Sequence, residues 1–284
     1  MSSGNLVFDC FTFFNELELL EIRLAEMSSA VDVFVLVEAP VTFQGKPKPL
    51  VFADNRSRFR SYLSRIRHIV VDDMPGGEAA WPREFHQRNA IRRGLEDAPS
   101  NAHVLVSDAD EIIRPRAVTA ARRLNAFCFF AMDLHFYFLD RRHERPWMKA
   151  YAAPWAYVRE MEDLSEPRMM GDGYFVKHGF DPAHHVIRNS GWHFTYMGGV
   201  ERMLAKLRAF SHQEEEVVRW QDEAALRREI EAGRWFYDGE PLSAASLRAL
   251  PVLVRRFPAH YHTIGLLASL PNLRQRLAAF VGVR

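Results

Sequence analysis

The apolar residues of this chain fall into short unbroken runs separated by segments with a different period. Residues 31–37 form a continuous apolar run that predicts a strand, residues 66–71 predict another, and residues 103–107 predict a strand that is buried on both faces, as in a parallel sheet. A shorter apolar run at residues 6–8 predicts a strand that ends at Asp9. The first part of the chain therefore has the pattern of a parallel sheet.

Helical spacing predicts the segments that connect these strands. The first helix has four apolar residues on one face: Leu17, Leu20, Leu24 and Met27. We expect Asn15 to cap this helix and Glu18 to complete a capping box. A strand, a helix and a strand within about thirty residues predict a βαβ unit with parallel strands. Further helices are expected at residues 57–63, 84–95 and 115–124.

The pattern changes in the second half of the chain. Residues 127–140 and 147–158 are rich in aromatic residues and predict longer, partly antiparallel strands. Residues 184–196 predict another strand or a hairpin, and residues 200–210 and 222–232 predict helices. We therefore expect an α/β fold with a mostly parallel central sheet, flanking helices and an antiparallel extension.

Composition narrows the class of protein. We expect one domain over residues 1–240 and a helical extension, residues 241–284, packed on it. With 48% hydrophobic residues and a net charge of +1, the chain has a large core and no overall field that favours nucleic acid. Its two cysteines form no disulfide framework, which predicts a cytoplasmic location. Residues 1–6 lack signal-peptide features and no apolar run reaches membrane-spanning length, so any membrane contact is expected to be peripheral, on the cytosolic face.

The most informative stretch is AHVLVSDADE, residues 102–111, where a buried strand runs directly into acidic residues. Open α/β sheets bind ligands at the carboxyl ends of their strands. On an extended chain Asp108 and Asp110 point the same way, so their oxygens can converge on a divalent cation that carries a phosphorylated ligand. The alternative is a strand that ends in a solvated acidic turn.

Other residues are candidates for the same cleft. His193 lies between two aromatic residues and can be the third metal ligand, or else a hydrogen-bonded core histidine. Glu38 at a strand end, and Arg88 with Asn89 on the helix before the central strand, are expected to contact the ligand, unless they are simply solvated. The sequence contains no Walker A, G-x-G-x-x-G or G-x-S-x-G motif. A D-x-D diphosphate site points to nucleotide-sugar chemistry.

Six segments in matching order resemble glycosyltransferase family 17: FDCFTFFNELELLEIRL (8–24), VEAPVTFQGKPKPL (37–50), FHQRNAIRRGL (85–95), VLVSDADEI (104–112), GWHFTYMGG (191–199) and KLRAFSHQE (206–214). This family includes the β-1,4-N-acetylglucosaminyltransferase that adds the bisecting residue to N-glycans. The resemblance implies a GT-A type fold and an inverting transfer from a nucleotide sugar, typically UDP-N-acetylglucosamine. It also implies Mn²⁺ or Mg²⁺ at Asp108 and Asp110, with His193 as the histidine of the GWH segment.

The resemblance leaves the acceptor and the base to be assigned. Animal members have a membrane anchor and a stem that we do not find here, so we expect a bacterial surface polysaccharide or a secondary metabolite as acceptor. An inverting transferase needs a carboxylate base. Glu214 is the first choice and Asp163 the second, although either can be a solvated surface acid. Two rival classes are a metal-dependent nucleotide-sugar phosphohydrolase, which uses the same acids with water, and a non-catalytic sugar-binding protein.

Overall fold

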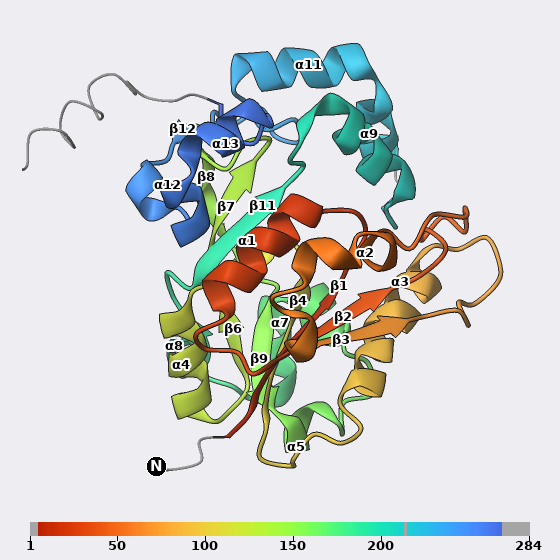
Figure 1. The fold of residues 1–284 in the computed structure, drawn as a ribbon, viewed down its shortest axis with the longest axis vertical. Helices are drawn as coiled ribbons and strands as arrows, with labels where there is room; N and C mark the ends of the chain where they lie inside the picture. Colours follow the sequence, from red (N-terminus) through yellow and green to blue (C-terminus); the bar gives the residue numbers. More distant parts are fainter. Residues whose placement is uncertain (1–4, 213–214, 269–284) are drawn as a thin grey trace, which may run out of the picture.

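The computed structural model describes residues 5–212 and 215–268, whose strands form two sheets (Figure 1). The central sheet has the strand order β10-β6-β9-β4-β1-β2-β3 among the described residues. Its strands are β1 (Val7–Thr12), β2 (Val33–Glu38), β3 (Ile66–Val70), β4 (His103–Asp108), β6 (Cys128–Phe130), β9 (Tyr151–Pro154) and β10 (Val186–Ile187). Strands β1 to β4 are mutually parallel, whereas β9 runs antiparallel to β4 and β6. The predicted mostly parallel sheet and βαβ unit are confirmed.

Both faces of the central sheet are buried, as the continuous apolar runs predict. Phe34 and Leu36 of β2 belong to a core shared with α1 (Leu17–Met27) and α4 (Pro115–Leu124), whereas Val35 and Val37 belong to a second core on the opposite face. Full burial of one such side chain stabilises a fold by roughly 1.5–3 kcal/mol. The strands therefore fix the sheet between two layers of helices.

The first strand is longer than predicted. It continues through Asp9 to Thr12, although Asp9 is fully buried. The strand tolerates this carboxylate because Arg23 of α1 forms an ion pair with it at 2.5 Å. The predicted end at Asp9 was wrong because a sequence pattern does not reveal that distant partner.

The first helix confirms the predicted apolar face but not the predicted cap. Helix α1 (Leu17–Met27) buries Leu20, Leu24 and Met27. Asn15 makes no side-chain cap; instead the carboxylate of Glu16 accepts hydrogen bonds from the backbone N–H groups of Phe14 and Asn15. The capping-box prediction for Asn15 and Glu18 was wrong, since Glu18 pairs with arginines of other segments.

The second sheet provides the predicted antiparallel extension. Its order is β12-β8-β7-β11-β5 in the described part of the chain. Its strands are β5 (Glu111–Ile113), β7 (Met132–Phe136), β8 (Arg141–Trp147), β11 (Gly191–Thr195) and β12 (Ser243–Ala244). All neighbours in it are antiparallel except β7 and β11. The aromatic run expected as one strand at residues 127–140 is divided, because β6 pairs in the central sheet and β7 in the second sheet.

Helices cover both sheets. The remaining helices are α2 (Val51–Asp54), α3 (Trp81–Asn89), α4 (Pro115–Leu124), α5 (Trp155–Val158), α6 (Glu166–Met170), α7 (Asp172–His178), α8 (Pro182–His185), α9 (Gly199–Ala209), α10 (Glu215–Val218), α11 (Glu223–Ala232), α12 (Val252–Arg256) and α13 (Pro258–Thr263). Short 3-10 helices are η1 (Arg56–Phe59), η2 (Leu63–Arg65), η3 (Ala90–Gly94), η4 (Arg219–Gln221) and η5 (Leu247–Ala249). The helix predicted at 57–63 is instead the end of η1, a turn and the start of η2. The helix predicted at 84–95 is α-helical up to Asn89 and of the 3-10 type from Ala90 to Gly94.

The described part of the expected C-terminal extension packs on the same core as α1. Val254 of α12 and Tyr261 of α13 are buried in the core that contains Leu20. Figure 1 shows α12 and α13 in blue beside the second sheet, with α9 and α11 at the opposite side of that sheet. None of the helices among residues 5–212 and 215–268 has the length and apolar character needed to cross a bilayer.

Candidate active site

A cavity of about 290 Å³ lies where the central sheet meets the second sheet. Thr12 and Asp108, the last residues of β1 and β4, contribute to its lining, so it opens at the carboxyl ends of parallel strands. Arg88 of α3 and Asp110 also line it, and we call Arg88, Asp108 and Asp110 the charged wall. A further part of the lining consists of rings that we call the aromatic wall: Phe136, Trp147, Tyr196, Trp235 and Tyr237.

Arg23 holds the backbone of the D-x-D motif in place. Its guanidinium is fully buried and donates to both carboxylate oxygens of Asp9, at 2.8 and 2.5 Å, and to the hydroxyl of Ser107 at 2.6 Å. It also donates to the backbone carbonyls of Asp108 (2.9 Å) and Glu111 (2.7 Å). One buried arginine therefore ties the ends of β1 and β4 to the turn that follows β4.

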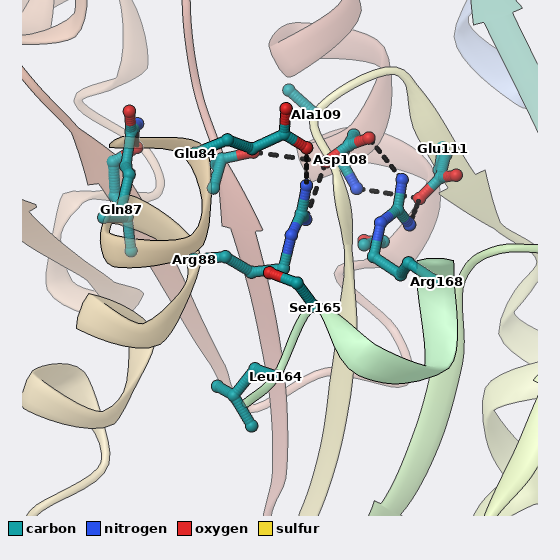
Figure 2. A network of polar contacts seen from close by, with 12 residues as sticks. Glu84, Gln87, Arg88, Asp108, Ala109, Glu111, Leu164, Ser165 and Arg168 are labelled. Atoms are coloured by element: carbon teal, nitrogen blue, oxygen red, sulfur yellow. Dashed lines mark hydrogen bonds and ion pairs between the residues drawn. The ribbon is translucent and has the colours of Figure 1, made fainter. Parts of the chain in front are cut away.

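Two arginines from different helices bind the carboxylate of Asp108 (Figure 2). Arg88 donates to Oδ1 at 2.8 Å, and Arg168 of α6 donates to Oδ2. Thr12 adds a hydrogen bond to Oδ1 at 3.2 Å. Burial alone would raise the pKa of Asp108, but the charges of Arg168 and then Arg88 outweigh it and hold that pKa well below its usual range. Asp108 therefore stays ionised.

Glu111 closes this network behind the cavity. It is fully buried, and its Oε2 accepts hydrogen bonds from the backbone N–H of Asp108 at 2.8 Å and from Arg168 at 2.6 Å. Its Oε1 accepts a hydrogen bond from the indole N–H of Trp147. Because Trp147 belongs to the aromatic wall, Glu111 links the two sides of the cavity.

Asp110 has a different set of partners. Lys206 of α9 lies 2.6 Å from its Oδ2, and Nε2 of His193 lies 3.5 Å from its Oδ1. Burial alone would raise the pKa of Asp110, but Lys206 and then His193 outweigh it and hold that pKa well below its usual range. His193 packs its ring 4.3 Å from that of Trp147. The structure thus brings Asp110 and His193 together, as the sequence predicts.

Two of the three predicted metal ligands lie close enough together to contact the same cation. Adjacent ligands of an octahedral ion with bonds of about 2.1 Å are about 3 Å apart. The 3.5 Å between Asp110 Oδ1 and His193 Nε2 fits this spacing. Asp108 does not complete the set as it stands, since both its oxygens face arginines. Metal ligation by Asp108, Asp110 and His193 therefore stays a prediction.

A second group of possible ligands, found among the described residues, has a different explanation. Ligand atoms of His143, Asp238 and Glu240 lie within 4.8 Å of one another. However, Nδ1 of His143 accepts a hydrogen bond from the backbone N–H of Arg145 at 3.1 Å. In a neutral ring this leaves the proton on Nε2, which lies 2.9 Å from Oε2 of Glu240 without a hydrogen bond to it. A histidine nitrogen that carries its proton is not a metal ligand.

Of the three other residues predicted to contact the ligand, one lines the cavity and two do not. Arg88 lines the cavity, as expected. Glu38 and Asn89 are not among the residues that line it. Glu38 is buried and accepts hydrogen bonds from the backbone N–H of Phe52 (3.0 Å) and from His68 (3.1 Å if the ring donates). Asn89 uses its amide to hold the segment that contains Asp163, at 2.8 Å.

Two residues are predicted as catalytic base, Asp163 and Glu214. Asp163 does not line the cavity, because its Oδ1 accepts hydrogen bonds from Asn89 and from the backbone N–H of Ser165, each at 2.8 Å. Glu214 lies outside the described residues. Both assignments stay predictions.

Sequence reasoning missed three cations of the site. Arg23 interrupts the apolar face formed by Leu20, Leu24 and Met27, and a charge in that position is a signal that it has a buried partner. Lys206 begins the family-like segment KLRAFSHQE and is one of only five lysines in the chain. Arg168 gave no such signal, since it follows an irregular acidic stretch.

Comparison with known proteins identifies the family. The model of "Glycosyltransferase family 17" matches residues 1–242. The human and rat enzymes named beta-1,4-mannosyl-glycoprotein 4-beta-N-acetylglucosaminyltransferase are each 28% identical to this chain over 107 residues. That match covers 34% of this chain and 20% of each relative, so it spans about a fifth of their length.

Solved structures resemble the chain only distantly. A putative glucose-1-phosphate thymidylyltransferase from Bacillus anthracis has a TM-score of 0.36 and 10% identity, covering 65% of this chain and 85% of its own. The galactosyltransferase LgtC, solved with donor and acceptor sugar analogues, has a TM-score of 0.32 and 11% identity, covering 94% of this chain and 97% of its own. The family model, in contrast, matches 242 of the 284 residues, and the chain belongs to glycosyltransferase family 17.

Proposed function

We propose that this protein is an inverting glycosyltransferase that moves N-acetylglucosamine from UDP-N-acetylglucosamine to a hydroxyl group of an acceptor. The observation that carries the proposal is the position of Asp108 and Asp110 in a cavity at the carboxyl ends of β1 and β4. Membership of glycosyltransferase family 17 and the names of the curated relatives support the choice of reaction and sugar.

The charged wall is the proposed donor side. Arg88 and Lys206 reach the cavity with cationic groups that suit a diphosphate. Asp110 and His193 would hold Mn²⁺ or Mg²⁺, with Asp108 beside them, and the ion when bound would neutralise charge on the departing diphosphate. The protein itself contributes orientation, because Arg23 fixes the backbone that carries both aspartates.

The aromatic wall is the proposed acceptor side. Binding pockets for small molecules are mostly apolar and aromatic, with few polar groups that set orientation. Phe136 stacks on Trp235 with ring centroids 4.8 Å apart, which makes a firm surface for the apolar face of an acceptor. The acceptor hydroxyl would lose its proton to Glu214, our first choice as base, with Asp163 as the second choice.

The first experiment is a thermal-shift screen of the purified chain against UDP-, GDP- and dTDP-sugars, each with Mn²⁺, with Mg²⁺ and with EDTA. We expect UDP-N-acetylglucosamine with Mn²⁺ to raise Tm most, because a ligand that binds only the folded state stabilises it. Asp110→Asn should lose this shift and keep its fold, since the substitution preserves shape. Asp163→Asn is the matched control and should keep the shift.

Transfer is then measured as UDP release in the presence of a panel of glycan and small-molecule acceptors. Release that depends on the acceptor supports the transferase. Equal release without any acceptor would instead identify a nucleotide-sugar phosphohydrolase. Binding without turnover by any acceptor would favour a sugar-binding protein, and no Tm shift with any donor would contradict the proposal.

A further inference from the structure

Both partners of Asp110 come from one continuous segment of the chain. His193 lies on β11, and Lys206 lies on α9, which follows β11 after a short turn. Gly198 and Gly199 in this turn have φ angles of 90° and 85°, values that favour glycine. The turn therefore sets α9 at an angle that lets Lys206 reach back to the carboxylate beside His193.

Lys206 occupies the position next to Asp110 as a cation. Its Nζ lies 2.6 Å from Oδ2 of Asp110 and 3.9 Å from Oε1 of Glu16, so two carboxylates hold the ammonium in place. Its side chain is 24% exposed and lines the cavity. A divalent ion between Asp110 and His193 would therefore meet a like charge on the other oxygen of the same carboxylate.

We propose that Lys206 and the divalent cation compete for Asp110, so that the metal binds tightly only together with the donor diphosphate, which Lys206 then also contacts. This inference rests on the proposed function and specifies how the same site is controlled. In the protein without donor, Lys206 supplies the positive charge that Asp110 requires. The diphosphate adds negative charge that both cations can share, and this removes the repulsion between them.

Lys206 differs from Lys177, a surface lysine that also forms an ion pair, in a way that supports this role. Lys177 pairs with Glu166 on the surface, where the lysine side chain is 51% exposed. Lys206, in contrast, pairs with a carboxylate whose side chain is 4% exposed and whose second oxygen faces a histidine. The oxygen of Asp110 that does not contact Lys206 therefore faces a second possible metal ligand.

The test is Mn²⁺ binding to the full chain, followed by the electron paramagnetic resonance signal of free Mn²⁺, without nucleotide and with UDP. Lys206→Met should bind Mn²⁺ about tenfold tighter than the parent without nucleotide, within the usual range of coupling between sites. UDP should raise the Mn²⁺ affinity of the parent strongly and that of Lys206→Met much less. Lys206→Met should also bind UDP more weakly than the parent in EDTA. Lys177→Met is the matched control and should behave as the parent.

Lys206→Arg provides a second variant that keeps the charge, and it should retain the weak Mn²⁺ binding of the parent without nucleotide. If Lys206→Met binds Mn²⁺ no tighter than Lys177→Met, the competition is overturned. If Lys206→Met does not fold, Lys206→Arg decides, because tight Mn²⁺ binding without nucleotide in that variant also overturns it. A parent that binds UDP but never Mn²⁺ overturns the competition alone, and a parent that binds neither overturns the proposed function as well.

Discussion

The charged wall and the aromatic wall of the cavity are built in opposite ways. Every side chain of the charged wall has a partner of opposite charge: Arg88 with Asp108, and Asp110 with Lys206. The aromatic wall is held by ring packing, for example that of Trp235 on Phe136. A charged wall changes its affinity when charge is removed, whereas an aromatic wall changes it with the size and shape of its rings. Substitutions on the two walls should therefore have separable effects.

The partners of the cavity-lining carboxylates also bear on the base, because each of these groups has at least one partner and Oε2 of Glu84 has no hydrogen-bond partner among the described residues. Four carboxylates among the described residues line the cavity: Glu16, Glu84, Asp108 and Asp110. Glu16 accepts a hydrogen bond from the N–H of Asn15 at 3.0 Å, and Glu84 pairs with Arg88 at 3.2 Å. The two aspartates are bound to arginines and to Lys206. A carboxylate held as an anion by cations is a weak proton acceptor.

The largest effect is expected at Glu214, our first choice as base. Glu214→Gln should lower turnover by about two to four orders of magnitude, the usual contribution of general-base catalysis, with UDP affinity unchanged. Turnover is measured with a saturating acceptor. Asp163→Asn is the comparison and should change turnover little, because Asp163 is engaged with Asn89. A nearly normal Glu214→Gln beside an inactive Asp163→Asn would transfer the role to Asp163.

The next largest effect is a loss of stability when Arg23, which holds the backbone of Asp108 in place, is replaced. Arg23→Met should lower the free energy of unfolding by about 3–5 kcal/mol, because it leaves Asp9 buried without its partner. Urea unfolding measures this value. Arg58→Met is the matched control, since Arg58 forms exposed pairs with Glu18 and Glu21, and it should cost about 1 kcal/mol or less. Equal losses in both variants would contradict the structural role of Arg23.

Arg23 also shows where sequence reasoning succeeds and where it stops. Asp108 and Asp110 are two positions apart at the end of a buried strand, so local pattern was sufficient to predict their position in the cleft. Arg23 contacts the carbonyl of Asp108 across 85 positions, and Lys206 contacts Asp110 across 96. No periodicity encodes such pairings, because they depend on how the layers pack. The parallel sheet follows from apolar runs, whereas the network that supports its active edge does not.

The aromatic wall was hard to predict for a similar reason. Phe136 and Trp235 are almost a hundred positions apart in the printed sequence and stack only because the segment after α11 returns to the second sheet. Aromatic residues also fill the core, so composition alone does not tell which of them line the cavity. The wrong prediction of one strand over residues 127–140 came from this ambiguity, since its two halves serve different sheets.

Each of the two sheets has a buried histidine that should make the free energy of unfolding fall in acid. His103 of β4 and His135 of β7 are buried, and burial lowers the pKa of each from 6.5 to about 4. Between about pH 6.5 and pH 4 the unfolded chain binds more protons at these sites than the folded chain does, so stability is present above pH 6.5 and is lost as pH falls toward 4. Each site contributes on the order of 3 kcal/mol over that range. His135→Phe should flatten the dependence of the unfolding free energy on pH, and an unchanged dependence would contradict it.

A smaller effect on kinetics is expected for Arg88→Lys, and it should distinguish donor binding from acceptor binding. Arg88→Lys keeps the charge but loses the planar fork, so we expect the donor KM to rise about tenfold, the equivalent of one charge-assisted hydrogen bond. The acceptor KM should stay close to that of the parent. Steady-state kinetics with each substrate varied in turn measures both values, and a donor KM that does not change would remove Arg88 from the donor site.

The smallest effect, and the counterpart of Arg88→Lys, is expected at Trp235. Trp235→Ala removes the ring that stacks on Phe136, and an aromatic pair contributes about 0.5–1.5 kcal/mol, so we expect the acceptor KM to rise about two- to tenfold. The donor KM and the affinity for UDP should stay unchanged, because Trp235 touches no residue of the charged wall by any ion pair or ring contact found in the described chain. Trp235→Phe keeps a ring and should recover most of the loss. If Trp235→Ala instead weakens UDP binding and leaves the acceptor KM alone, the aromatic wall holds the nucleotide, and the assignment of the two walls must be exchanged.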